Sequence, residues 1–246
     1  MTSTQLLVVI LASAAGATVK SVTGMGYPVI SVPLIALVAG VPDAVVVVAI
    51  PNLAANVYMC WESRDGRAES RDLGRLVGWG TVGAVIGTIA LVRLPNDPLM
   101  VLLAAMIVAF VVQFLRNPTL QLDASTTHKW SPVAGFIAGC MQGSIGVSGP
   151  VVGAWMHGYR LPMRAYIHSV TFIFGVTGFV QLVILLGQGQ MTSDRAVAMV
   201  CAGVTVSVVI PIGTRLRSRI AGNTFSYLVL GVLTFSAVSL LAQVIF

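Results

Sequence analysis

Charged residues are scarce in this chain. They make up 9% of its 246 residues, whereas hydrophobic residues make up 57%. A soluble domain carries about 25% charged residues, so a water-soluble fold could not hide this much apolar surface. Apolar runs at residues 74–92 and 224–246 have the length, roughly 17–25 residues, that crosses the hydrocarbon core of a bilayer. The composition therefore predicts an all-α protein that spans the membrane several times.

Acidic residues are missing from the interior of every apolar run. All Asp and Glu residues fall in loops or near predicted helix ends: Asp43, Glu62, Asp65, Glu69, Asp72, Asp97, Asp123 and Asp194. Intramembrane carboxylates mark proton relays and the acidic rings of cation channels, so their absence argues against both. It also fits an anionic solute.

Cysteine is rare as well. Cys60, Cys140 and Cys201 form no CxxC pair, which predicts packed apolar side chains rather than a metal centre or disulfide framework. A membrane enzyme would need a nucleophile with a base, or a ligand cluster, at one depth. We therefore expect no catalytic centre, no metal and no cofactor. The net charge of +6 is carried by short loops, which indicates membrane orientation rather than binding to nucleic acid.

Two of the predicted hydrophobic segments are interrupted. The segments cover residues 4–40, 43–61, 73–92, 98–116, 131–158, 162–187, 195–213 and 223–246, and the breaks lie at 20–28 and 142–150. Glycine and proline at this density do not continue a helix, so each break predicts two half-helices joined by unwound backbone. Each broken segment is followed by three further segments, and Pro33 can be laid on Pro150. This order predicts a duplicated transporter with repeats at 1–120 and 121–246.

The basic residues favour broken segments that are hairpins, each entering and leaving on one side of the membrane. Only Arg93 and Arg195 then lie on one side. The other side holds Arg64, Arg67, Arg71, Arg75, Arg116, Lys129, Arg160, Arg164, Arg215, Arg217 and Arg219. Positive residues collect in cytoplasmic loops. The count predicts two inverted repeats, each opened by a broken, re-entrant hairpin, with both termini on the non-cytoplasmic side.

The two hairpin tips form the predicted substrate site. Unwound backbone at membrane depth is tolerated where it lines a wet cavity or is covered by protein, and helix N-termini offer amides to an anion. The candidate residues are Ser21, Thr23, Gly24, Met25, Gly26, Gln142, Gly143, Ser144, Ile145, Gly146 and Ser148. A sulfonate, sulfite or carboxylate would suit these donors. The alternative is that the glycines only permit close helix packing.

Polar residues in neighbouring segments extend this site. Lys20 lies inside an apolar run and is either the counter-charge for an anion or a lysine that snorkels toward water. Asn52 and Asn56 share a helical face and predict either cavity lining or interhelical hydrogen bonds. His168 and Thr171 occupy the related part of the sixth segment. His168 either carries a coupling proton or bonds to a neighbouring helix.

A glycine pair elsewhere bears on oligomeric state. Gly83 and Gly87 make a small-xxx-small face. Such a face is typical either of close helix packing or of a contact with a second copy, so a homodimer stays open.

The broken segments resemble the sulfite exporter family of bacterial membrane proteins, named for its TauE and SafE members. The resemblance is carried by residues 23–34 with 40–44, and by 142–150 with 161–162, and it covers essentially the whole chain. Met25, Tyr27, Ile145 and Val147 interrupt glycine runs that are longer in family members.

The resemblance implies a secondary transporter in the bacterial inner membrane that exports sulfite or an organosulfonate through an inverted-repeat fold. We expect alternating access, in which one repeat rocks against the other. A passive anion channel and a non-transporting subunit of a membrane complex are the alternatives.

Overall fold

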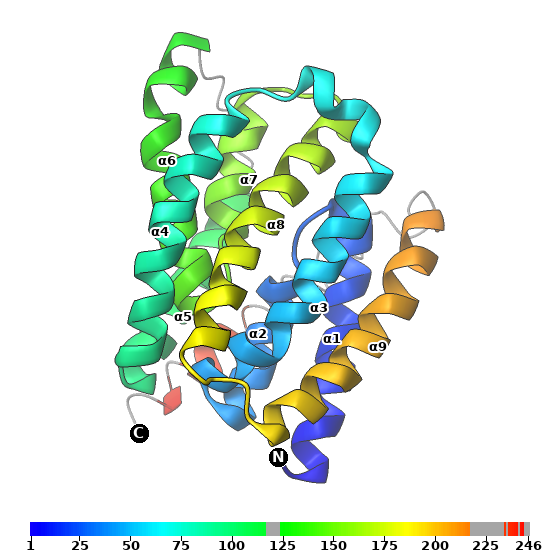
Figure 1. Ribbon diagram of the computed structural model, residues 1–246, viewed down its shortest axis with the longest axis vertical. Helices are drawn as coiled ribbons and strands as arrows, with labels where there is room; N and C mark the ends of the chain where they lie inside the picture. Colours follow the sequence, from blue (N-terminus) through cyan, green and yellow to red (C-terminus); the bar gives the residue numbers. More distant parts are fainter. Residues whose placement is uncertain (117–123, 217–233, 235, 241, 244–246) are drawn as a thin grey trace.

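The structure is a computed structural model that describes residues 1–116, 124–216, 234, 236–240 and 242–243 (Figure 1). The described regular structure is helical, as predicted. The α-helices are α1 (Ser3–Thr23), α2 (Tyr27–Ala39), α3 (Val41–Glu62), α4 (Leu73–Arg93), α5 (Asn96–Arg116), α6 (Ala124–Ile145), α7 (Gly149–Gly158), α8 (Met163–Gly187) and α9 (Ser193–Arg215). A 3-10 helix, η1 (Arg64–Glu69), joins α3 to α4. Most of the predicted eighth segment, 223–246, lies outside the described residues.

The long helices have the length and composition of membrane spans. Within the described residues α1, α3, α4, α8 and α9 each have 21 to 25 residues and an apolar character sufficient to cross a bilayer. Large apolar side chains also face outward. On α9, Val200, Val204 and Val208 are more than half exposed, and their spacing of four places them on one helical face. Such a face is favourable against lipid, and the chain is a multi-pass membrane protein.

Each broken segment folds into a hairpin of one long and one short helix. Figure 1 shows that the α1–α2 hairpin opens toward the end of the molecule that holds the N-terminus, whereas the α6–α7 hairpin opens toward the opposite end. The prediction of paired half-helices is wrong for α1 and α6. They have 21 and 22 residues, and at 1.5 Å per residue α1 alone extends about 31 Å. The short members, α2 and α7, have 13 and 10 residues.

Left-handed glycines make both bends. Gly24 and Gly26 have φ angles of 83° and 113°, and Gly146 has a φ of 70°. Glycine adopts this conformation without the steric cost that a Cβ atom adds. Gly24 donates its backbone N–H to the carbonyl of Lys20 at 2.8 Å and Gly146 donates to that of Gln142 at 3.0 Å. Both hydrogen bonds end a helix at its glycine, which allows the chain to reverse direction.

Three structural landmarks recur 122 positions apart in the two halves. They are the glycine that ends the long helix, the first residue of the short helix and the first residue of the helix that follows. The pairs are Gly24 and Gly146, Tyr27 and Gly149, and Val41 and Met163. In this register Pro28 corresponds to Pro150, so the sequence-based pairing of Pro33 with Pro150 is wrong. Both prolines are in the first turn of their short helices, where the missing N–H has no intrahelical acceptor.

Glycines bring α4 and α6 into backbone contact. A Cβ atom on Gly87 of α4 would lie 2.2 Å from the carbonyl oxygen of Cys140, and one on Gly83 would lie 2.2 Å from that of Phe136. On α6, a Cβ on Gly139 would lie 2.0 Å from the carbonyl oxygen of Gly80. The predicted glycine face therefore packs within the chain, which leaves the homodimer without support from this pair.

Replacing Gly139 by leucine is expected to prevent folding, because the side chain would occupy the space of the α4 backbone. Overpacking of this kind costs about 1–3 kcal/mol or more, and here the opposing group is main chain rather than a movable side chain. The measurement is thermal unfolding and size exclusion of the purified variant in detergent. Gly203→Leu on α9 is the control, since a Cβ there meets nothing within 4 Å. Equal stability of the two variants would contradict the packing.

A hydrogen-bonded cluster ties the outer end of α7 to the starts of α4 and α6. The Asp72 carboxylate accepts a hydrogen bond from Tyr159 Oη at 2.8 Å, and His128 Nδ1 lies 2.8 Å from its other oxygen. Trp155 Nε1 donates to Tyr159 Oη at 3.0 Å. Partial burial acts to raise the pKa of Asp72, but the hydrogen bonds from His128 and Tyr159 and the nearby positive charge of Arg71 outweigh it, so the pKa is lowered.

The Asp72 cluster is expected to stabilise the protein at neutral pH and to weaken in acid. Because folding lowers this pKa, the stabilisation is complete above the unfolded value of about 3.9 and is lost as the pH falls through the folded value. Asp72→Asn should therefore lower the melting temperature at pH 7, and the difference from the parent should shrink below about pH 4. Thermal unfolding in detergent across this range is the measurement, with exposed Asp97→Asn as control. A difference that stays constant with pH would contradict a role for the carboxylate charge.

Candidate functional site

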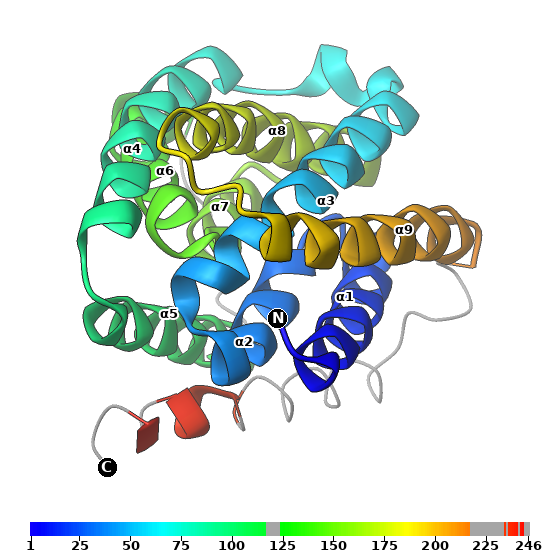
Figure 2. The same cartoon turned by 60° about the horizontal axis from the view of Figure 1, so that its bottom comes forward.

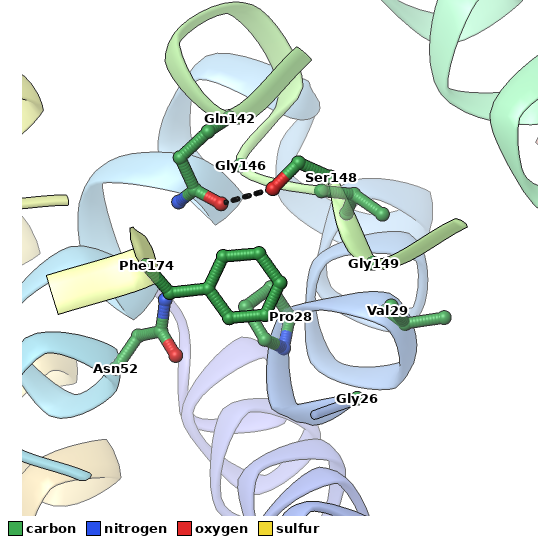
Figure 3. Close-up of a pocket in the computed structure, with 10 residues that line it drawn as sticks. Gly26, Pro28, Val29, Asn52, Gln142, Gly146, Ser148, Gly149 and Phe174 are labelled. Atoms are coloured by element: carbon green, nitrogen blue, oxygen red, sulfur yellow. Dashed lines mark hydrogen bonds between the residues drawn. The ribbon is translucent and has the colours of Figure 1, made fainter. Parts of the chain in front are cut away.

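The two hairpin bends meet around a small internal cavity (Figure 3). Its walls come from both hairpins, from α3 and from α8. They are formed by Gly26, Pro28, Val29, Asn52, Gln142, Gly146, Val147, Ser148, Gly149 and Phe174. The cavity offers about 10 Å³ to the centre of a water-sized sphere, which is room for about one water molecule. Five of the predicted site residues line it: Gly26, Asn52, Gln142, Gly146 and Ser148.

Polar side chains complete the wall formed by the α6–α7 bend. Ser148 Oγ donates to Gln142 Oε1 at 3.1 Å, as Figure 3 shows. Gln181 of α8 donates from Nε2 to the carbonyl oxygens of Gln142 and Gly143 at 3.0 and 3.1 Å. These carbonyls are in the last turn of α6, where intrahelical donors run out. The Gln142 carbonyl also accepts the Gly146 N–H that ends the helix.

Lys20 is fully buried beside this cavity. Its side chain has no solvent exposure, so the alternative in which it snorkels to water is wrong. Lys20 Nζ donates to Asn56 Oδ1 at 2.6 Å and lies 5.8 Å from the centre of the Phe174 ring. None of the ion pairs within the described residues involves this amine. A buried ammonium group without a carboxylate partner is costly.

The two asparagines of α3 connect Lys20 to the cavity. Asn56 holds the lysine, and Asn52, one helical turn earlier, lines the cavity. Asn52 Oδ1 and Asn56 Nδ2 are both buried and have no hydrogen-bond partner in the described part of the chain. Buried polar atoms are rarely left unpaired, and each such exception calls for an explanation. One predicted alternative, interhelical bonding, holds for Asn56, and the other, cavity lining, holds for Asn52.

The hydroxyls of the first bend bond to nearby backbone carbonyls. Ser21 Oγ donates to the carbonyl of Thr18 at 2.7 Å, and a Cβ on Gly213 of α9 would collide with this hydroxyl. Thr23 Oγ1 bonds to the carbonyl oxygens of Val19 and Met25 and so stabilises the bend. These hydroxyls do not line the cavity.

Glycine and methionine at this bend make apolar contacts. A Cβ on Gly24 would lie 3.2 Å from Ile167 of α8. Met25 Sδ lies close to two glycines of the other hairpin. A Cβ added to Gly149 would be 3.8 Å from this sulfur, and a Cβ added to Gly153 would be 3.2 Å from it. Met25 therefore packs the first bend against α7.

Three candidates of the second bend belong to helix packing. A Cβ on Gly143 would lie 2.5 Å from the carbonyl oxygen of Ala84 on α4. Ser144 Oγ donates to the carbonyl of Cys140 at 2.7 Å within its own helix. Ile145 is fully buried in the apolar core. The structure places these three outside the cavity wall, and at Gly143 this matches the packing alternative.

His168 and Thr171 also lie away from the cavity. His168 Nδ1 is 3.2 Å from the carbonyl oxygen of Cys60 on α3. The imidazole ring of His168 stacks on the ring of Phe172. Thr171 Oγ1 donates to the carbonyl of Ile167 at 2.7 Å. The histidine thus bonds to a neighbouring helix, as the structural alternative predicted.

The sequence-based site lacked five residues that line the cavity, Pro28, Val29, Val147, Gly149 and Phe174. It also lacked Gln181, which bonds to the cavity wall. Gln181 is a buried amide in the middle of an apolar helix, and polar groups at such depth are functional candidates, so its signal was present. Phe174 carried no signal, because an aromatic residue in an apolar run is ordinary.

A cavity between two broken helices, with a buried cation beside it and apolar helices around it, is an arrangement that fits a membrane transporter. Comparison with protein families identifies the particular kind. The family model described as sulfite exporter TauE/SafE matches residues 8–240, nearly the whole chain, and the chain belongs to this family of membrane transporters. The predicted resemblance is confirmed. No curated protein and no solved structure matches the chain.

Proposed function

We propose that this chain carries a small oxyanion, sulfite or an organosulfonate, across the bacterial inner membrane by alternating access. The observation that carries the proposal is the buried Lys20 amine, which lacks a carboxylate partner among the described residues and adjoins the cavity between the two bends. Membership in the sulfite exporter family supports the same cargo.

The electrostatics of this centre favour an anion. Removing an ammonium group from water costs several kcal/mol unless an opposite charge or several hydrogen bonds compensate it. Lys20 has one amide oxygen, that of Asn56, in hydrogen-bond contact. A bound anion would supply the missing charge, and the unpartnered Asn56 Nδ2 would donate to it. A cationic solute would be repelled by the same group.

Two inverted repeats, 1–120 and 121–246, give this site its mechanism. The constant 122-residue spacing and the hairpins that open toward opposite ends support the repeats. Four of the ten cavity residues form two pairs at this spacing: Gly26 with Ser148, and Asn52 with Phe174. Since each repeat supplies matching parts of the wall, rocking of one repeat against the other would expose the cavity to alternate sides.

The size of the cavity favours a transporter over a passive channel. Room for about one water molecule is too little for sulfite. A substrate of that size therefore requires the cavity to widen, which rocking of one repeat against the other would allow. A channel, the second candidate, would instead need a continuous wet path.

Loop charges support an orientation in the membrane. Figure 1 places η1 and the starts of α4 and α8 at one end of the molecule, with the N-terminus and the start of α9 at the other. The first end holds Arg64, Arg67 and Arg164, and the second holds Arg93 and Arg195. By the positive-inside rule the η1 end is cytoplasmic and the N-terminus is not.

Solute flux into proteoliposomes tests the proposal. Purified protein would be reconstituted and supplied with sulfite, 2-aminoethanesulfonate, sulfate or acetate under a proton gradient, a sodium gradient or a membrane potential. We expect sulfite or the sulfonate to accumulate above its external concentration, with protein-free vesicles and the Lys20→Met variant inactive. Flux that only equilibrates the anion would indicate a channel. Absence of sulfite and sulfonate flux from folded protein would contradict the proposal.

A further inference from the structure

The asparagine next to Lys20 has a determined orientation. An ammonium group is a donor without acceptor capacity, so with Lys20 charged the atom of Asn56 that faces Nζ at 2.6 Å is the amide oxygen. Asn56 Nδ2 is then the free end of the amide, and it is fully buried without a partner. Lys20 and Asn56 together present hydrogen-bond donors and one positive charge.

Asn52 presents a hydrogen-bond acceptor at the cavity, whereas Lys20 and Asn56 present donors. Its Oδ1 is buried without a partner, and its amide group lines the cavity (Figure 3). Rotating the amide by 180° would exchange its oxygen and nitrogen, but either orientation leaves one oxygen that needs a donor. Of the nearby donors, Ser148 Oγ donates to Gln142 Oε1, and Gln142 Nε2 donates to Gln181 Oε1 at 3.5 Å. The carbonyl oxygen of Asn52 therefore has to be satisfied by water or by the ligand.

We propose that the ligand is a monoanion that carries its own hydrogen-bond donor, which deepens, and rests on, the proposed transport of sulfite or organosulfonates. Its negative oxygens would contact Lys20 and Asn56, and its donor, a hydroxyl, an ammonium or the proton of hydrogen sulfite, would contact Asn52 Oδ1. A fully deprotonated dianion or a plain alkanesulfonate would leave this oxygen buried and unpaired.

The distances suit a short molecule. Asn52 and Asn56 are one helical turn apart, and Cβ atoms at this spacing are about 5–6 Å apart, which is comparable with the length of a two-carbon sulfonate. Phe174 lies next to both the cavity and the Lys20 ammonium group, since it lines the cavity and its ring centre is 5.8 Å from Lys20 Nζ. Sites that hydrogen-bond a substrate hydroxyl discriminate strongly against the analogue that lacks it, because their own polar group is then left unpaired.

Binding of two matched sulfonates tests the inference. Isothermal titration of the purified full chain in detergent would compare 2-hydroxyethanesulfonate with ethanesulfonate at one pH, since the two share charge and carbon chain. We expect the hydroxylated compound to bind about tenfold tighter or more. In Asn52→Leu the preference should disappear, through weaker binding of 2-hydroxyethanesulfonate with ethanesulfonate little changed. Thr205→Val on α9, where the hydroxyl bonds to the Cys201 carbonyl, should keep the preference.

The outcomes separate this inference from the proposed function. Equal affinities in the parent protein would overturn the inference and leave sulfonate transport standing, and this comparison needs no variant to fold. A preference that survives in Asn52→Leu, or in Asn52→Val if the leucine variant does not fold, would overturn the role of Asn52. Failure of both sulfonates to bind the folded parent would overturn the proposed function together with the inference.

Discussion

Replacement of Lys20 by methionine is expected to weaken sulfonate binding by about 30-fold or more and to abolish concentrative transport. The reason is that one partner of a buried charge pair contributes about 2 kcal/mol or more to binding. Methionine approximates the shape of the lysine stem without the charge. Kd by titration and flux in proteoliposomes are the measurements.

Stability separates this loss from misfolding. The ammonium group is fully buried and bonds to Asn56 alone in the described chain, so removing it should leave the melting temperature unchanged or raise it. A variant that binds sulfonate normally would make the lysine a bystander. One that unfolds at lower temperature would make Lys20 a structural residue.

The repeat register supplies a matched second variant. Gln142 lies 122 positions after Lys20, in the same turn before the glycine bend, and it lines the cavity. Lys20→Gln should lose binding as Lys20→Met does, and the double variant Lys20→Gln/Gln142→Lys should regain about tenfold, because a cation again adjoins the cavity. No recovery in a folded double variant would contradict the related roles of the two positions.

Substitution of leucine at Gly146 is expected to abolish transport while the protein still inserts into the membrane. The residue has a φ of 70°, which costs a non-glycine residue about 1–2 kcal/mol. A Cβ there would lie 3.4 Å from Val45, and the rest of the side chain would fill a cavity of about 10 Å³. Gly24→Leu should act similarly, since its φ is 83°.

Gly178→Ala is the control for both bend variants, because a Cβ on this α8 glycine meets nothing within 4 Å. Flux and size exclusion in detergent should show inactive but monodisperse bend variants beside an active control. Normal flux through Gly146→Leu would remove the bend from the substrate path. Gly143→Leu is expected to differ in kind, because Gly143 contacts the α4 backbone and its replacement should destabilise the protein.

The hairpins were predictable because their signals are local. Glycine and proline act on the backbone where they stand, so residues 20–28 and 142–150 indicated the two bends. The side of the membrane from which each hairpin enters stays a prediction of the loop arginines. The lengths of α1 and α6 were mispredicted. Helix α1 continues into the first break as far as Thr23, and α6 begins at Ala124, before the predicted segment, and continues to Ile145.

Which residues face the cavity could not be predicted from local signals. Glycine serves as a hinge or as a packing surface according to what faces it, and nothing in the sequence distinguishes Gly146, at the cavity, from Gly143, against α4. The bond from Lys20 to Asn56, 36 positions apart, and that from Gln181 to the last turn of α6 depend on how the helices pack.

Composition and pattern alone established a multi-pass helical membrane protein, two glycine bends and a cation inside an apolar segment, because hydrophobicity and backbone conformation are properties of individual residues and their neighbours. The tertiary structure decided which of those polar residues share one cavity. Lys20 adjoins it and His168 does not, because helices far apart in sequence are brought together by packing that no single segment encodes.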